Sequence, residues 1–195
     1  MVENYTHFII IISGPSGVGK STITKMILNK YTNIKLSISA TTRNPRDGEI
    51  EGVSYYFISQ DDFDLKVKNE EFFEYARHYG NSYGTLKSEI DKDIKNNDIL
   101  LDIDWKGKNQ VLEKIKDKSE ILTIFILPPS IEELEKRLRD RKTDSEEKIK
   151  MRLDDVKNTI NHAKEYEYTV INDDINKVFN EICSIIDNKR LENKI

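Results

Sequence analysis

Residues 14–21 have the types and the spacing that bind phosphate groups. They read GPSGVGKS and match the pattern G-x-x-x-x-G-K-S of a phosphate-binding loop. Glycines let such a loop curl so that successive backbone N–H groups converge on one phosphate. The pattern places Lys20 near the β- and γ-phosphates of a nucleotide and the hydroxyl of Ser21 on Mg²⁺. The alternative is an ordinary glycine turn beside a stray lysine.

The elements on both sides of the loop favour phosphate binding. An apolar, β-branched run at 8–12 predicts a strand before the loop, and a helical pattern begins near Ser21. A helix in that position directs its positive amino end at a bound phosphate. We therefore expect a nucleotide here, and the rest of the chain must specify what receives its phosphoryl group.

Cationic side chains occur on three separate segments, which suits a reaction in which two phosphate-bearing substrates meet. Any single exposed arginine is usually only part of the surface, so their significance depends on the loop. The planar guanidinium recognises oxyanions more specifically than the ammonium of lysine does. The candidates are Lys20 in the loop, Arg43 and Arg46 in a turn-rich segment, and Arg137, Arg141 and Arg152 in a highly charged stretch.

Two acids, Asp102 and Asp104, end an apolar run that predicts a buried strand. Ligands of open parallel sheets bind at the carboxyl ends of the strands. An acid at that edge can hold Mg²⁺ through its water ligands or position a substrate. The alternative is a strand-end acid that caps the next helix, and we favour the functional interpretation because the same sheet should carry the loop.

The elements that must position these residues alternate between strands and helices, which predicts an α/β fold with a parallel sheet covered on both faces. Residues 80–84 read as a turn, and 34–85 as a small β-rich lobe inserted after the first helix. Strands are expected at 8–12, 34–39, 55–58, 71–79, 99–104, 122–127 and 168–171. Residues 137–152 have few apolar members, so they predict either a mobile lid or a solvated charged hairpin.

Composition limits the possible functions. The 195 residues suffice for one core with small inserted lobes, and the net charge of −4 argues against general binding to nucleic acid or acidic membranes. No apolar run is long enough to span a membrane, and the first residues do not resemble a signal peptide. The single cysteine, Cys183, lies in an apolar helical pattern and fits a buried position in a cytoplasmic protein. His7, His78 and His162 lack metal-ligand spacing.

Further motifs give the chain a resemblance to the guanylate kinase family over nearly its whole length. In the family's order, the matching pieces are GPSGVGKST, SISATTRNPRDGEIEGVSYYF, FFEYARHYGNSYGT, ILLDIDWKG, IFILPPS, RLRDR and VINDD. The resemblance implies a P-loop kinase fold in one domain, 1–195, with an acceptor-binding lobe and a helical lid. The implied division is a core of 1–33, 86–136 and 153–195, a GMP-binding lobe of 34–85 and a lid of 137–152.

The resemblance also implies a role for particular residues. Those implied to bind GMP are Ser39, Arg43, Arg46, Tyr55 and Tyr83 at the phosphate, Glu74 and Thr85 at the base, and Asp102 and Asp104 close by. Those implied to bind ATP are Gly14, Pro15, Ser16, Gly17, Val18, Gly19, Lys20, Ser21 and Thr22, with Asn172 near the adenine. The implied catalytic set is Lys20, Arg43, Arg137, Arg141 and Arg152, and the implied Mg²⁺ ligands are Ser21 and, through water, Asp102.

The implied reaction is Mg²⁺-dependent transfer of the γ-phosphoryl group from ATP to GMP, giving ADP and GDP, by a monomer or homodimer whose partners are these nucleotides. A carboxylate at Glu74 can accept hydrogen bonds from the N1–H and 2-amino groups of guanine, whereas adenine would leave it unpaired. Two alternatives stay open: another P-loop kinase, or a guanylate kinase-like binding module for phosphorylated peptides. The intact phosphate loop favours the enzyme.

Overall fold

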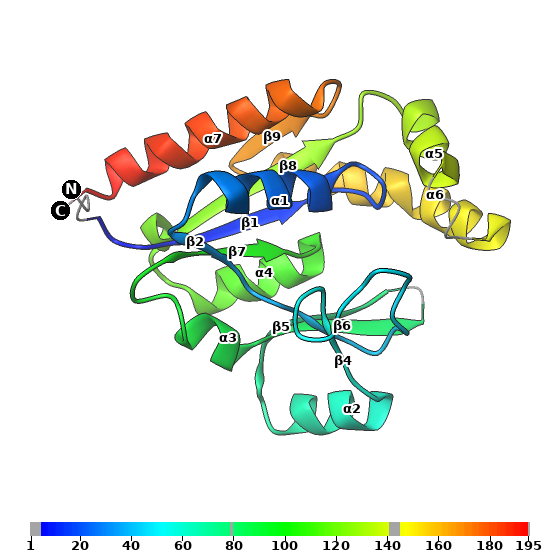
Figure 1. Ribbon diagram of the computed structural model, residues 1–195, viewed down its shortest axis with the longest axis horizontal. Coiled ribbons are helices and arrows are strands. Elements are labelled where there is room, and N and C mark those ends of the chain that lie inside the picture. The colour runs from blue at the N-terminus through cyan, green and yellow to red at the C-terminus, as the bar shows by residue number, and fades with distance from the viewer. Residues whose placement is uncertain (1–4, 79, 141–144, 195) are drawn as a thin grey trace.

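The computed structural model describes residues 5–78, 80–140 and 145–194. Its centre is a five-stranded sheet in the order β2-β7-β1-β8-β9, in which every neighbouring pair is parallel (Figure 1). The strands are β1 (Ile9–Ser13), β2 (Ile34–Leu36), β7 (Asp98–Asp102), β8 (Ile121–Leu127) and β9 (Tyr168–Ile171). Strands buried on both faces read as continuous apolar runs, as β1 and β8 do.

Helices cover both faces of this sheet (Figure 1). Alternate side chains of β1 enter two separate cores: Ile10 and Ile12 pack with α1 and α7, whereas Ile9 and Ile11 pack with α3 and α4. The helices are α1 (Lys20–Lys30), α3 (Lys87–Asp91), α4 (Trp105–Lys114), α5 (Ile131–Asp140), α6 (Glu146–Asn161) and α7 (Ile175–Glu192), with short 3₁₀ turns η1 (Lys118–Glu120) and η2 (His162–Glu165). The predicted α/β fold is confirmed.

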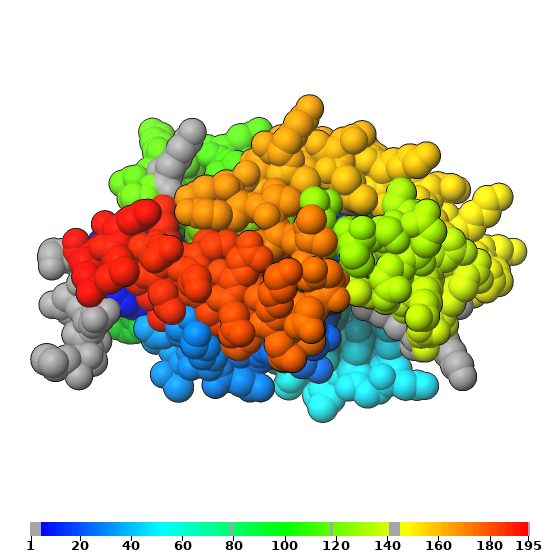
Figure 2. All heavy atoms as spheres, turned by 90° about the horizontal axis from the view of Figure 1, so that it is seen from above, coloured from blue at the N-terminus to red at the C-terminus, as the bar shows by residue number. Residues whose placement is uncertain are grey.

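Helix α7 lies along the outer surface beside α1 (Figure 2). It carries Cys183, which is buried in the larger core, as its apolar neighbours predicted. No helix in the part of the chain that the structure describes is long and apolar enough to cross a membrane.

A second sheet forms the inserted lobe, in the order β4-β3-β6-β5 (Figure 1). Its elements are β3 (Ala40–Thr41), β4 (Tyr56–Phe57), α2 (Gln60–Lys68), β5 (Phe72–His78) and β6 (Asn81–Leu86). Ala40, Phe63 and Phe72 are the buried centre of a small core of its own. The rings of Phe63 and Phe72 stack with centroids 4.4 Å apart.

Two local expectations for the lobe were wrong. Residues 81–84 are not a turn but belong to β6, which pairs antiparallel with β5. Gly84 is needed for close packing, since an added Cβ would lie 2.8 Å from the ring of Phe72. The strand expected at 34–39 ends at Leu36, and Ala40–Thr41 pairs in the second sheet instead. Pairing with remote segments thus decides both outcomes: it makes a strand of residues with turn preferences, and it moves Ala40–Thr41 into the second sheet.

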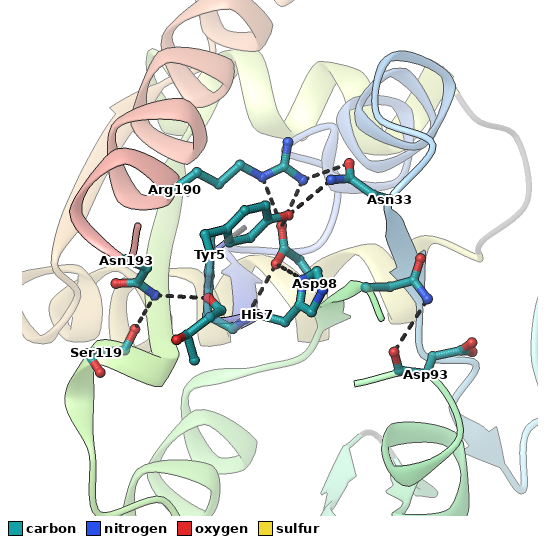
Figure 3. Close-up of polar contacts among 11 residues, drawn as sticks. Tyr5, His7, Asn33, Asp93, Asp98, Ser119, Arg190 and Asn193 are labelled. Atoms are coloured by element: carbon teal, nitrogen blue, oxygen red, sulfur yellow. Dashed lines mark hydrogen bonds and ion pairs between the residues drawn. The ribbon is translucent and has the colours of Figure 1, made fainter. Parts of the chain in front are cut away.

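A buried polar cluster joins the two ends of the chain to the amino edge of the central sheet (Figure 3). Asp98, at the start of β7, is fully buried and accepts hydrogen bonds from Arg190 Nε at 2.9 Å and Nη2 at 2.7 Å. The Tyr5 hydroxyl donates to the same oxygen of Asp98 at 3.0 Å, and His7 contacts the other oxygen at 3.2 Å. The cluster therefore fixes the N-terminal segment and α7 at the edge opposite the phosphate loop.

Candidate active site

A cavity of about 260 Å³ lies at the carboxyl ends of β1 and β7, between the central sheet, the lobe and α6. It brings together most of the residues that the sequence singled out, from segments far apart in the chain. These are Gly14, Pro15, Ser16, Gly17, Gly19, Lys20, Ser21, Ser39, Arg43, Arg46, Tyr55, Glu74, Tyr83, Asp102, Asp104 and Arg152. The remaining described candidates, Val18, Thr22, Thr85, Arg137 and Asn172, are not part of its lining. Arg141 lies outside the described residues.

The loop between β1 and α1 is held in a tight curl. Gly19 precedes α1 with φ 105°, and an added Cβ would lie 2.6 Å from Nδ2 of Asn172. That amide donates to the carbonyl of Val18 at 2.7 Å, so Asn172 supports the loop from behind. No side chain caps α1 at Gly19, and Lys20 Nζ donates to the carbonyl of Gly14 at 2.8 Å. The amino end of α1 is thus presented to the cavity, where it favours an anion.

Arginines from the charged stretch approach this loop from α5 and α6. Arg152 Nη1 donates to Ser16 Oγ at 2.6 Å, so α6 contributes a cation directly to the cavity wall. Arg137 Nη2 donates to the carbonyl of Asn172 at 3.2 Å, and its Nε pairs with Glu133 at 3.0 Å. The structure thus places Arg137 beside the residue that supports the loop.

The lobe contributes two further cations, and Glu49 bonds the side chain of one and the backbone of the other. Its carboxylate accepts two hydrogen bonds from Arg43, at 2.8 and 2.9 Å, and one from the backbone N–H of Arg46 at 2.7 Å. Burial alone would raise the pKa of Glu49, but these hydrogen bonds outweigh it and lower that pKa. The guanidinium of Arg43 also lies 5.3 Å from the ring centroid of Tyr55. Sequence reasoning missed Glu49, because nothing local marks it as the partner of Arg43.

A buried carboxylate faces the cavity from β5. Glu74 is only 3% exposed, and its Oε1 accepts a hydrogen bond from Thr85 Oγ1 at 2.6 Å. Burial raises the pKa of Glu74 to about 7, the charge of Asp104 adds to this, and the Thr85 hydrogen bond partly offsets it. Gly107 allows the close approach of α4, since an added Cβ would lie 2.3 Å from Glu74 Oε2. Such a carboxylate suits recognition of a ligand that presents N–H donors.

The position of Asp104 in the sequence allowed two interpretations: an acid that caps the next helix, or an acid of the binding site. Its Oδ1 accepts a hydrogen bond from the N–H of Gly107 at 2.7 Å and so caps α4. Its Oδ2 contacts Nε2 of His78, and the residue also lines the cavity. The capping role and a place in the site are therefore compatible.

Several cavity residues were not found by sequence reasoning. Trp105 follows Asp104 at the cavity and stacks on His162 with ring centroids 3.7 Å apart. Asp155 and Thr159 line the cavity from α6. They follow Arg152 by three and seven residues, so helical spacing from that arginine could have identified them.

The donor set at Ser21 and Asp102 fits Mg²⁺. Both residues line the cavity, and they offer a hydroxyl and a carboxylate, which are ligands that Mg²⁺ accepts. Burial raises the pKa of Asp102, and the charge of Lys20 opposes this shift. Among the described residues there is no cluster of three or more acidic, histidine or cysteine side chains that could hold a metal. Ser21 and Asp102 could hold an ion that takes its other ligands from phosphate and water.

A glycine-rich loop between a parallel strand and a helix, facing a separate cationic lobe, defines a P-loop phosphotransferase. Comparison with known proteins specifies it further: the model of the family described as guanylate kinase matches residues 6–189. The chain belongs to the guanylate kinase family, whose members are nucleoside monophosphate kinases that phosphorylate GMP with ATP.

Individual relatives agree with this assignment. Guanylate kinase of Rickettsia prowazekii is 48% identical over 186 residues, covering 95% of this chain and 93% of the relative. Guanylate kinase of Fusobacterium nucleatum is 46% identical over 179 residues, covering 91% and 95%. The crystal structure of guanylate kinase from Anaplasma phagocytophilum matches with a TM-score of 0.78 at 30% identity, covering 97% of this chain and 89% of that one.

Proposed function

We propose that this chain transfers the γ-phosphoryl group of ATP to GMP in the described cavity, with Mg²⁺, and that the residues named above divide into a donor and an acceptor half. One observation carries this proposal: a single cavity joins the phosphate loop to a buried carboxylate, Glu74, on a separate lobe. A phosphate loop alone would serve many substrates. A buried hydrogen-bond acceptor opposite the loop narrows the acceptor to a molecule with matching donors.

The donor half is the loop with its helix. Backbone N–H groups, the amino end of α1 and Lys20 hold the phosphates of ATP, and Arg152 adds a cation from α6. Ser21 and, through water, Asp102 would hold Mg²⁺, which neutralises charge on the phosphate oxygens. These groups act by positioning and by stabilising charge that develops during transfer.

The acceptor half is the lobe. Arg43 and Arg46 hold the phosphate of GMP, with Ser39, Tyr55 and Tyr83 around them. Glu49 keeps the guanidinium of Arg43 in place.

Glu74 provides the selectivity for guanine. Its carboxylate accepts from the N1–H and 2-amino groups of guanine, and Thr85 supports it from behind. Adenine offers an acceptor at N1 and no 2-amino group, so it would leave a buried carboxylate unpaired.

The reaction requires no general base. The second pKa of a phosphomonoester is about 6, so the phosphate of GMP is mostly a dianion at neutral pH and attacks without losing a proton. Cations, rather than a proton acceptor, are what the site must supply, and the cavity is lined by Lys20, Arg43, Arg46 and Arg152.

Residues 137–152 form a lid in this proposal, with 34–85 as the GMP-binding lobe and the rest as the core. The hydrogen bond from Arg152 to Ser16 supports this division, because it joins α6 to the loop that holds the donor. Closing the lid would exclude water that could otherwise accept the phosphoryl group. The lid arginines Arg137 and Arg141 act on the transferring group in this scheme. The single buried cysteine supports a cytoplasmic setting.

An ADP-release assay with GMP, AMP, UMP and dTMP tests the function. We expect turnover with GMP to exceed the others by orders of magnitude, and comparable rates with AMP would refute guanine selectivity. Lys20→Ala should abolish most turnover, because it removes the ammonium from the loop. A Lys20→Ala protein with full activity would contradict the catalytic role of the loop. Absence of any turnover, together with binding of a phosphorylated peptide, would favour a binding module instead.

A further inference from the structure

We propose that His78 is a positioning residue for guanine recognition: it holds Asp104 in the base-binding end of the cavity and thereby sets selectivity for the 2-amino group. This inference rests on the proposed function, since it concerns the same GMP-binding half of the site. It adds a residue on β5, His78, that lies within a matching piece of sequence but was given no role there.

The alternation of side chains along β5 directs His78 to the cavity. Successive residues of a strand face opposite sides, so Glu74, Ala76 and His78 share one face. All three line the cavity. Tyr75 and Arg77, on the other face, are exposed. His78 is therefore placed by the same strand geometry that places the carboxylate of Glu74.

The contact between His78 and Asp104 fixes a carboxylate that joins the lobe to the core. Nε2 of His78 contacts Oδ2 of Asp104, while Oδ1 of Asp104 accepts from the N–H of Gly107 at 2.7 Å. Each carboxylate oxygen thus has a partner, one on β5 and one on α4, and this fixes the plane of the carboxylate. The side chains of His78 and Asp104 are each 23% exposed, so both still border the space that a base would fill.

The same contact affects Glu74 through charge. Two factors disfavour the ionised form of Glu74, which is the form that accepts hydrogen bonds from guanine. The larger is burial, and the other is the negative charge of Asp104. An imidazole N–H directed at Asp104 offsets part of that charge. Loss of His78 should therefore weaken guanine binding in two ways: Asp104 is less well oriented, and Glu74 is less readily ionised.

The test compares GMP with IMP, which keeps the N1–H of guanine but lacks the 2-amino group. The variants are His78→Ala, His78→Gln, which keeps an N–H donor, and the control Arg77→Ala. Arg77 is the next residue along β5, its side chain is 69% exposed, and it pairs with Asp64. For each protein, kcat and KM are measured for GMP, for IMP and for ATP, after circular dichroism has established that the variant is folded.

We expect His78→Ala to raise KM for GMP by about tenfold, from the loss of a hydrogen bond to a charged group, with kcat and KM for ATP nearly unchanged. The ratio of kcat/KM for GMP over IMP should fall by about the same factor, because IMP makes fewer contacts with the two carboxylates. His78→Gln should recover part of both effects, and Arg77→Ala should match the wild type. If His78→Ala does not fold, the test depends on His78→Gln. In that variant the ratio of kcat/KM for GMP over IMP must still fall, by less than the tenfold expected of His78→Ala.

Two results overturn the role of His78. One is an unchanged GMP over IMP ratio in both His78 variants, and the other is a loss of kcat shared equally by both nucleotides, which would indicate a purely structural role. A wild-type protein that does not turn over GMP overturns the proposed function itself, so the two failures are distinguishable.

Discussion

Replacing Glu74 by glutamine should stabilise the nucleotide-free protein while it removes guanine recognition. Burial raises the pKa of Glu74 from 4.5 to about 7, so the folded protein holds the ionised form less readily than the unfolded chain does. The difference of about 2.5 pKa units, at about 1.4 kcal/mol each, amounts to about 3–4 kcal/mol well above pH 7. Glutamine carries no charge, and its amide oxygen can still accept the hydrogen bond from Thr85.

The sign of the pH dependence distinguishes this explanation from a general packing effect. Below pH 4.5 Glu74 is neutral in both states, so the substitution should change the free energy of unfolding little. As the pH rises from 4.5 through 7, the unfolded chain loses this proton first, and the wild type loses stability that the variant keeps. The advantage of Glu74→Gln should therefore grow across that window and stay constant above it.

Urea unfolding of both proteins at pH 4.5, 5.5, 7 and 8.5 measures this difference. Glu71→Gln is the control, because Glu71 lies just before β5 but its side chain is 39% exposed, and hydrogen bonds from Lys66 and Asn69 lower its pKa. The control should show no gain at high pH. A stability difference for Glu74→Gln that is absent at pH 8.5, or that is equal at every pH, would refute the reasoning. In the same variant kcat/KM for GMP should fall by about a hundredfold or more, with KM for ATP nearly unchanged.

Two further predictions concern the terminal cluster and the pH dependence of activity. Asp98→Ala should lower the free energy of unfolding by about 3–5 kcal/mol in urea titrations, because it leaves Arg190 without its buried partner. The KM values for both nucleotides should not change. A variant as stable as the wild type would contradict the role of the cluster. In a pH–rate profile, kcat/KM for GMP should fall as the pH drops below about 7, where Glu74 takes up a proton. Glu74→Gln should lose that step and keep only the break near pH 6 from the phosphate of GMP, and an identical profile in both proteins would exclude Glu74 as its source.

The central sheet could be predicted from sequence because its signals are local. The apolar runs of β1, β7 and β8 are bounded by glycine, acids or proline, and nearly all of their residues are buried. In β9 only Val170 is buried, but its β-branched residues still indicated a strand. The phosphate loop needed only the residues on either side of it. The lobe was less predictable, because β3 is only two residues long and β6 is rich in small and polar residues. They become strands through pairing with each other and with β4 and β5.

The residues of the site also fall into two groups, those that local sequence could predict and those that it could not. Residues in motifs, such as Lys20 and Arg43, were identified from their neighbours in the chain, and the structure places both at the cavity. Glu49 and His78 could not be identified in this way, because the importance of each depends on a side-chain partner that local sequence patterns do not reveal. Arg43 and Glu49 are six residues apart across a loop, and His78 meets Asp104 from another element altogether.

The residues proposed to recognise the base and those proposed to bind the acceptor phosphate lie on parts of the lobe that differ in how they are supported. β5 is an edge strand, and α4 covers its edge: Gln110 donates to the carbonyl of Tyr75 at 2.7 Å and accepts from its N–H at 3.1 Å, and Lys114 contacts the carbonyl of Phe73. A side chain amide thus replaces the missing neighbouring strand. Glu74 lies between these contacts, so it is held to the same helix that Asp104 caps.

Arg43 and Arg46, by contrast, lie on the segment between β3 and β4, outside any helix or strand, where Glu49 bonds the guanidinium of Arg43 and the backbone N–H of Arg46. Sites built on regular elements hold their geometry more closely than sites on loops do. Discrimination between bases depends on the placement of a buried carboxylate, whereas a phosphate dianion can be held by cations that adjust to it. In the proposed site, the carboxylates assigned to the base therefore lie on a strand and a helix cap that are bonded to each other, and the arginines assigned to the acceptor phosphate lie on a loop.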